Sequence, residues 1–216
     1  MLEVAMEKKA SLDQYIDQAL EEQKAEFRSQ LEPFEVHAAK LRQHIHTEFD
    51  RYAEQFLHGY TLLAPISTND EAIAQIDSFE KVIAFISEGK SLWELFGYTP
   101  DILVELYQKA YKMVENHHYD DGHDAYLFIV TVAPHFREAW LNLGYCLCKQ
   151  NKQLEGIEAF GNALKLDPTC ADSYLAAAGA YLKLNDKQSA LQLCDYGIEE
   201  YDLQQLQEAK IYIEGR

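Results

Sequence analysis

The chain has 216 residues, which is enough for one large domain or two small ones. Apolar residues make up 48% of it and charged residues 25%, as in ordinary soluble globular proteins. Its 19 basic and 36 acidic side chains give a net charge of −17, which argues against nucleic acid or an anionic membrane as the main partner.

The first part of the chain has the apolar periodicity of helices. We expect helices over residues 12–31, 34–60 and 70–87, separated by Pro33 and by the break at residues 64–69. Their apolar stripes are rich in aromatic side chains: Phe27, Phe34, Phe49, Tyr52, Phe56 and Phe79. Such stripes must be buried against each other, against the rest of the chain or against a second copy. We therefore expect residues 1–87 to form an N-terminal helical extension that takes part in a homodimer.

A short helix is expected between Gly89 and Gly97, and a longer one after it. Thr99 has the properties of an N-cap, Pro100 suits the first helical position, and Asp101 lies near the positive end of the helix dipole. No stretch alternates polar and apolar residues as a strand would. The predicted fold class is all-α.

From about residue 103 the sequence repeats itself at a shift of 34 residues. The shift aligns three sets of residues: Leu106, Trp140 and Tyr174; Ala110, Gly144 and Ala178; Gly122, Gly156 and Ala190. This period and the order of large and small residues resemble the tetratricopeptide repeat, in which stacked helical hairpins form a solenoid. We expect repeats at 103–136, 137–170 and 171–204 within a domain of residues 88–212. The alternative is a helical bundle with accidental periodicity.

In such a solenoid the first helix of each hairpin lines the concave face. The expected positions are Tyr107, Tyr111, Val114, Leu141, Tyr145, Cys148, Leu175, Gly179 and Leu182. This apolar and aromatic set would suit an extended peptide with apolar anchors, although some members could belong to the core instead. Some tetratricopeptide grooves bind the C-terminal carboxylate of a partner, and such a site needs cationic side chains. Of the residues at the corresponding positions of this chain, only Asn142 matches such a site.

Two short segments add a second resemblance. Gly89-Lys90-Ser91-Leu92-Trp93-Glu94-Leu95 followed by Leu106-Tyr107-Gln108-Lys109-Ala110-Tyr111 resembles the start of the repeats in bacterial type III secretion chaperones of translocator proteins. Tyr119-Asp120-Asp121-Gly122 resembles the turn in their first repeat, with Gly122 in place of the usual alanine. The long N-terminal extension departs from the family, which has only a short arm there.

The resemblance implies a cytoplasmic bacterial chaperone that holds an extended segment of a hydrophobic translocator and keeps it soluble for export. Tyr107, Tyr111, Val114, Tyr119 and Tyr145 fall where the family has its groove residues. The alternative is an adaptor that oligomerises through its N-terminal helices and tethers a folded partner through its repeats.

No enzyme, cofactor or metal is expected. The four cysteines have no redox or zinc spacing and are expected to be reduced core thiols. The run from His117 to Asp124 could bind a metal, but it coincides with a predicted polar turn. No secretory signal and no membrane span is expected. The last four residues, Ile213-Glu214-Gly215-Arg216, match a protease site often engineered into recombinant proteins.

Overall fold

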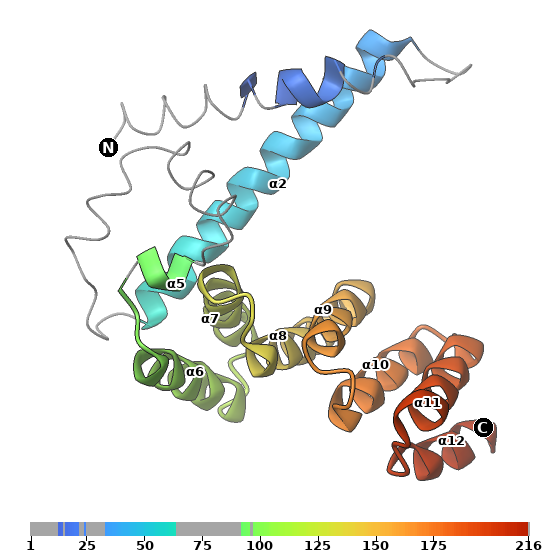
Figure 1. Ribbon diagram of the computed structural model, residues 1–216. Coiled ribbons are helices and arrows are strands. Elements are labelled where there is room, and N and C mark those ends of the chain that lie inside the picture. Colours follow the sequence, from blue (N-terminus) through green and yellow to red (C-terminus); the bar gives the residue numbers. More distant parts are fainter. Residues whose placement is uncertain are drawn as a thin grey trace. The chain divides into compact units, whose positions relative to one another are not determined.

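The computed structural model describes residues 13, 14, 16–21, 24, 33–63, 92–95 and 97–215. All the regular structure in these ranges is helical, as predicted (Figure 1). The described residues divide into two compact units, one with residues 13–55 and 92–98 and the other with residues 56–63 and 99–215. The predicted helix at 70–87 lies outside the described residues.

The first unit contains most of the long helix α2 (Phe34–Leu63) and the short helix α5 (Leu92–Leu95). Ile16 and Leu20, which lie in a preceding helical segment, are buried against one face of α2. That face is made of Phe34, Ala38, Leu41, Ile45 and Phe49, largely the stripe expected from the sequence. The N-terminal helices therefore pack on each other through their predicted apolar faces, in the part that the structure describes.

The last two turns of α2 belong to the second unit. The helix expected over residues 34–60 continues three residues further and ends at Leu63. The rings of Phe56 and Tyr60 pack on Phe128, with centroids 5.0 and 5.7 Å away. Lys109 donates a hydrogen bond of 3.1 Å to the carbonyl of Leu63. This end of α2 thus contacts the first hairpin of the repeats.

The second unit contains three helical hairpins in a short solenoid (Figure 1). Their first helices are α6 (Pro100–Glu115), α8 (Arg137–Lys149) and α10 (Ala171–Lys183), and their second helices are α7 (Tyr119–Val132), α9 (Gln153–Leu166) and α11 (Lys187–Tyr201). The predicted start of the first hairpin is confirmed, because the side chain of Thr99 accepts a hydrogen bond from the Ile102 amide and Pro100 follows it.

The turn inside each hairpin has the same geometry. His117, Asn151 and Asn185 adopt left-handed backbone conformations with φ of 63°, 64° and 60°, and they are spaced at the repeat length of 34 residues. After each of them the next amide bonds back to the first helix, as His118 N does to Met113 O at 2.9 Å. These hydrogen bonds pair carbonyl groups that would otherwise be unsatisfied at the end of the first helix.

Small residues allow close approach of the two helices within the hairpins. A Cβ on Gly144 would lie 2.5 Å from the Phe160 ring and 2.9 Å from the Gly156 carbonyl oxygen. Phe160 is buried between its own hairpin and the next, in a cluster with Cys148, Ala177 and Ala180. The half-buried Trp140 donates its indole N–H to the carbonyl of Pro134 at 2.8 Å.

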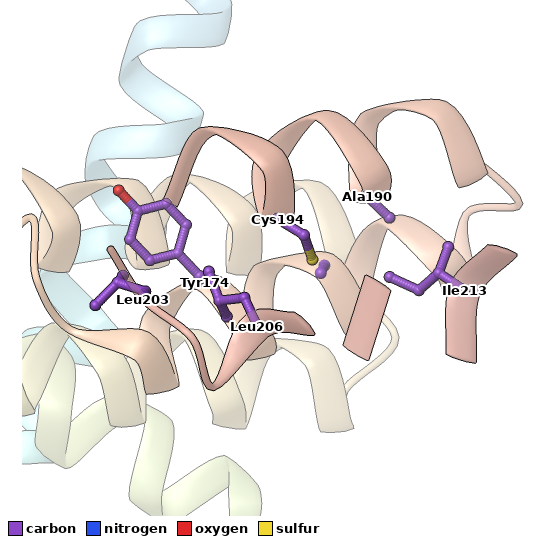
Figure 2. Packing of buried hydrophobic residues seen from close by; sticks show 7 residues of the cluster. Tyr174, Ala190, Cys194, Leu203, Leu206 and Ile213 are labelled. Atoms are coloured by element: carbon purple, nitrogen blue, oxygen red, sulfur yellow. The ribbon is translucent and has the colours of Figure 1, made fainter. Parts of the chain in front are cut away.

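One further helix, α12 (Leu206–Glu214), follows the third hairpin. Figure 2 shows how Leu206 and Ile213 pack with Tyr174, Ala190 and Cys194 of α10 and α11. The repeat pattern in the sequence ends at residue 204 and did not predict this helix. It covers the apolar end of the solenoid, which stacked repeats otherwise leave open.

The four cysteines are buried free thiols, as predicted. Burial raises the pKa of the Cys146 thiol to about 12, so this thiol stays protonated at neutral pH. Within the described ranges, no helix combines the length and the apolar character needed to cross a bilayer.

Candidate functional site

The candidate site is the face formed by the first helices of the hairpins, which we call the first-helix face and define by the residues predicted to line the groove. Tyr111, Tyr145 and Leu175 expose 43%, 41% and 37% of their surface there. Tyr107, Leu141 and Leu182 are half-buried, as is Tyr119, which lies at the start of α7. Val114 and Cys148 are buried, so they offer a partner little surface.

Tyr107 is the centre of an aromatic cluster on α6. Its ring stacks on Tyr111 at 6.2 Å and packs on Tyr126 and Phe136 at 5.7 and 5.3 Å. Its hydroxyl accepts a hydrogen bond of 2.9 Å from the Asn142 amide, which links α6 to α8. Burial raises the pKa of Tyr107 more than the bond from Asn142 lowers it, so the hydroxyl stays neutral.

A second aromatic group lies at the other end of the same helices. Tyr119 and Tyr145 meet edge to face with centroids 6.1 Å apart. The ammonium of Lys149 lies 4.9 Å from the Tyr145 ring centroid and 5.6 Å from that of Tyr119. His117 Nδ1 lies 2.9 Å from the Tyr119 hydroxyl. These contacts hold two tyrosine rings in place with a cation beside them.

The remaining predicted residues continue the surface with aliphatic side chains. Leu141 packs against the buried cluster around Phe160, and Leu182 packs against the C-terminal cluster. Leu175 on α10 stays exposed. The first-helix face therefore presents aromatic rings from α6 and α8 and an aliphatic side chain from α10, the kind of surface that binds apolar anchors.

Tyr126 is a residue that the sequence analysis did not assign to the site. In the sequence it aligns with Phe160 and Cys194 at the repeat shift of 34 residues. In the structure it is fully buried on α7, directly against Tyr107. Its hydroxyl has no hydrogen-bond partner among the described residues. The sequence offered one sign of its difference: Tyr126 has a hydroxyl group at a repeat position where the other two repeats have the apolar side chains of Phe160 and Cys194.

The histidines of the run 117–124 have separate partners. His123 is buried and its Nδ1 lies 2.7 Å from one oxygen of Asp124, while Nδ1 of His58 lies 2.7 Å from the other. Burial alone would raise the pKa of Asp124, but the hydrogen bonds from His123 and His58 outweigh it and the pKa is lowered. In the described part of the chain, no three His, Cys, Asp or Glu side chains come together as metal ligands would.

Comparisons with known proteins agree with this architecture. A family profile described as tetratricopeptide repeat matches residues 149–204. No curated protein is found that resembles the sequence.

Several solved structures share the fold. A type III secretion complex from Aeromonas hydrophila superposes with a TM-score of 0.55 and 19% identity, covering 62% of this chain and 93% of that one. The type III secretion translocator chaperone SycD of Yersinia enterocolitica has a TM-score of 0.51 and 17% identity, covering 58% and 94%. PcrH in complex with the chaperone-binding region of PopD has a TM-score of 0.50 and 16% identity, covering 56% and 96%. At these identities the likeness establishes the fold.

Proposed function

We propose that the protein is a chaperone that binds an extended hydrophobic segment of a type III secretion translocator on its first-helix face and keeps that client soluble in the bacterial cytoplasm until export. The observation that carries this proposal is the exposure of Tyr111 and Tyr145, each above 40%, whose rings contact those of Tyr107 and Tyr119. The shared fold supports it, because SycD is a translocator chaperone and PcrH binds a region of PopD.

The chemistry of the face suits such a client. Tyrosines bury a large area at a low cost in conformational entropy, and their hydroxyls orient a peptide by hydrogen bonds. The rings of Tyr107 and Tyr111 stack on each other, so together they present one aromatic surface. The net charge of −17 keeps the chaperone and its client complex dispersed while the apolar surface is in use.

Co-expression tests the proposal. The client is a hydrophobic translocator from the same genome, and the protein should co-purify with it as a soluble complex. The double variant Tyr111→Ala/Tyr145→Ala should lose most of the bound client, because it removes the two exposed rings. Tyr196→Ala is the matched control, since Tyr196 is 52% exposed but lies on the second helix α11. Equal recovery of client with the double variant and the control would place the binding surface elsewhere.

The same experiment separates the chaperone from the adaptor alternative. A chaperone holds an unfolded segment, so a short client peptide should compete for the complex. An adaptor binds a folded partner, and a short peptide would not displace it.

A further inference from the structure

Tyr126 has an orphaned hydroxyl, and its ring belongs to the aromatic cluster around Tyr107. Tyr126 is 0% exposed, and its hydroxyl makes no hydrogen bond within the described structure. Leaving a buried hydroxyl unpaired costs free energy, because the group has given up its bonds to water. Native proteins keep few such groups, and each calls for a physical reason.

The repeats show that the fold does not require this hydroxyl. Phe160 and Cys194 occupy the same position in the second and third hairpins and are buried to the same degree. Phe160 has the same ring without the oxygen. A phenylalanine at 126 would therefore fill the space equally well and remove the unpaired group.

Tyr126 packs against the first-helix face from behind, because its ring contacts that of Tyr107 with centroids 5.7 Å apart. Burial is the main cause of its raised pKa, and the further contributions come from Tyr107, Cys146 and Tyr111. These residues lie on α6 and α8, the two helices that supply the aromatic part of the first-helix face. Tyr111 is 43% exposed, so this region borders the solvent-accessible part of the first-helix face.

We propose that the Tyr126 hydroxyl is a hydrogen-bond donor kept for the bound client, where it pairs with a backbone carbonyl of the extended segment once Tyr111 has moved aside. The inference rests on the proposed function. An extended segment has backbone carbonyls that form no hydrogen bonds within it, so any client sequence in that conformation supplies an acceptor. The hydroxyl thus favours an extended backbone at this point whatever the client side chain.

The first test needs no client. Tyr126→Phe should raise the melting temperature by about 2–4 °C, because it removes an unpaired buried group. Tyr174→Phe is the matched control, because Tyr174 is 2% exposed and its hydroxyl is not among the orphaned groups; this variant should melt at or below the wild-type temperature. A fall in the melting temperature of Tyr126→Phe would show that the hydroxyl is already satisfied, for instance by a trapped water, and would overturn the proposal.

The second test measures binding. The probes are synthetic 15-residue peptides tiled across a hydrophobic translocator from the same genome, and the tightest binder is used for titration. Tyr126→Phe should weaken its binding about 3- to 10-fold, the effect of one hydrogen bond, and Tyr174→Phe should leave it unchanged. Equal affinity of Tyr126→Phe and the wild type would overturn the proposal. If no peptide binds even the wild type, the proposed function itself fails, which is a different result.

The third test identifies the acceptor. Each amide of the bound peptide is replaced in turn by an ester, which weakens the carbonyl as an acceptor. At one position the loss of affinity should be smaller for Tyr126→Phe than for the wild type, because the variant has no donor there. Equal losses at every position would contradict the pairing with a backbone carbonyl.

Discussion

Gly59 of α2 lies directly against the backbone carbonyl of Asp124 on α7. A Cβ at position 59 would overlap that carbonyl and lie 3.1 Å from the Cβ of Phe128. The aromatic pairs of Phe56 and Tyr60 with Phe128 depend on this close crossing. It fixes the end of α2 to the first hairpin.

Gly59→Ala should therefore destabilise the protein. Overpacking at a tight contact costs about 1–3 kcal/mol, which exceeds the gain in helix propensity. Gly161→Ala is the control, because nothing lies within 4 Å of a Cβ at that position of α9, and it should stabilise the protein by about 0.5–1 kcal/mol. Denaturant unfolding measures both changes. An increase in stability with Gly59→Ala would contradict the crossing.

The pair of imidazoles on Asp124 should make stability depend on pH. The pKa of Asp124 is lowered in the folded protein, so its contribution is present above the unfolded value of 3.8 and is lost as the pH falls through the folded value. Asp124→Asn should remove the loss of stability that protonation of Asp124 causes at low pH, and should leave the contributions of other groups unchanged. Unfolding curves collected between pH 5 and pH 2 check it, and equal acid sensitivity of variant and wild type would argue against the pair.

The hydrogen bond from Asn142 to Tyr107 should couple α6 to α8 energetically. A double-mutant cycle with Tyr107→Phe and Asn142→Leu should give a coupling of about 1 kcal/mol in unfolding free energy. The same cycle with Tyr174→Phe in place of Tyr107→Phe should give none, since Tyr174 packs in the C-terminal cluster. Additive effects for the first pair would mean that the bond contributes nothing to stability.

A homodimer remains our expectation for the intact chain. Val36 and Leu57 on α2 are 45% and 60% exposed, and a second copy of the chain is the partner we propose for this helix. Light scattering at low micromolar concentration should give twice the chain mass of 24.9 kDa. A mass of one chain at all concentrations would exclude the dimer.

The sequence predicted the features that depend on local pattern. Thr99 and Pro100 marked the start of α6 because N-caps and first-turn prolines act within one turn of helix. The 34-residue shift predicted three hairpins because each repeat contacts its neighbours in the same way. Gly144 and Gly156 could be placed at close helix approaches for the same reason.

The features that were missed depend on contacts between distant parts of the chain. Gly59 had the composition of a helix stop, and only its contact with Asp124 shows why a glycine lies within α2. The position of Tyr126 was known from the repeat, but the lack of a partner for its hydroxyl becomes visible only when its neighbours are placed. Val114 and Cys148 followed the periodicity of the first helices, yet neighbouring helices cover them.

Site-specific photo-crosslinking in the intact client complex tests the central claim most directly. A photoreactive phenylalanine analogue is placed at Leu175 on α10, or at Leu154 on α9, which is 66% exposed and belongs to a second helix. The account predicts crosslinks to the translocator from position 175, and none from position 154. Crosslinks from position 154 with none from position 175 would contradict binding on the first-helix face.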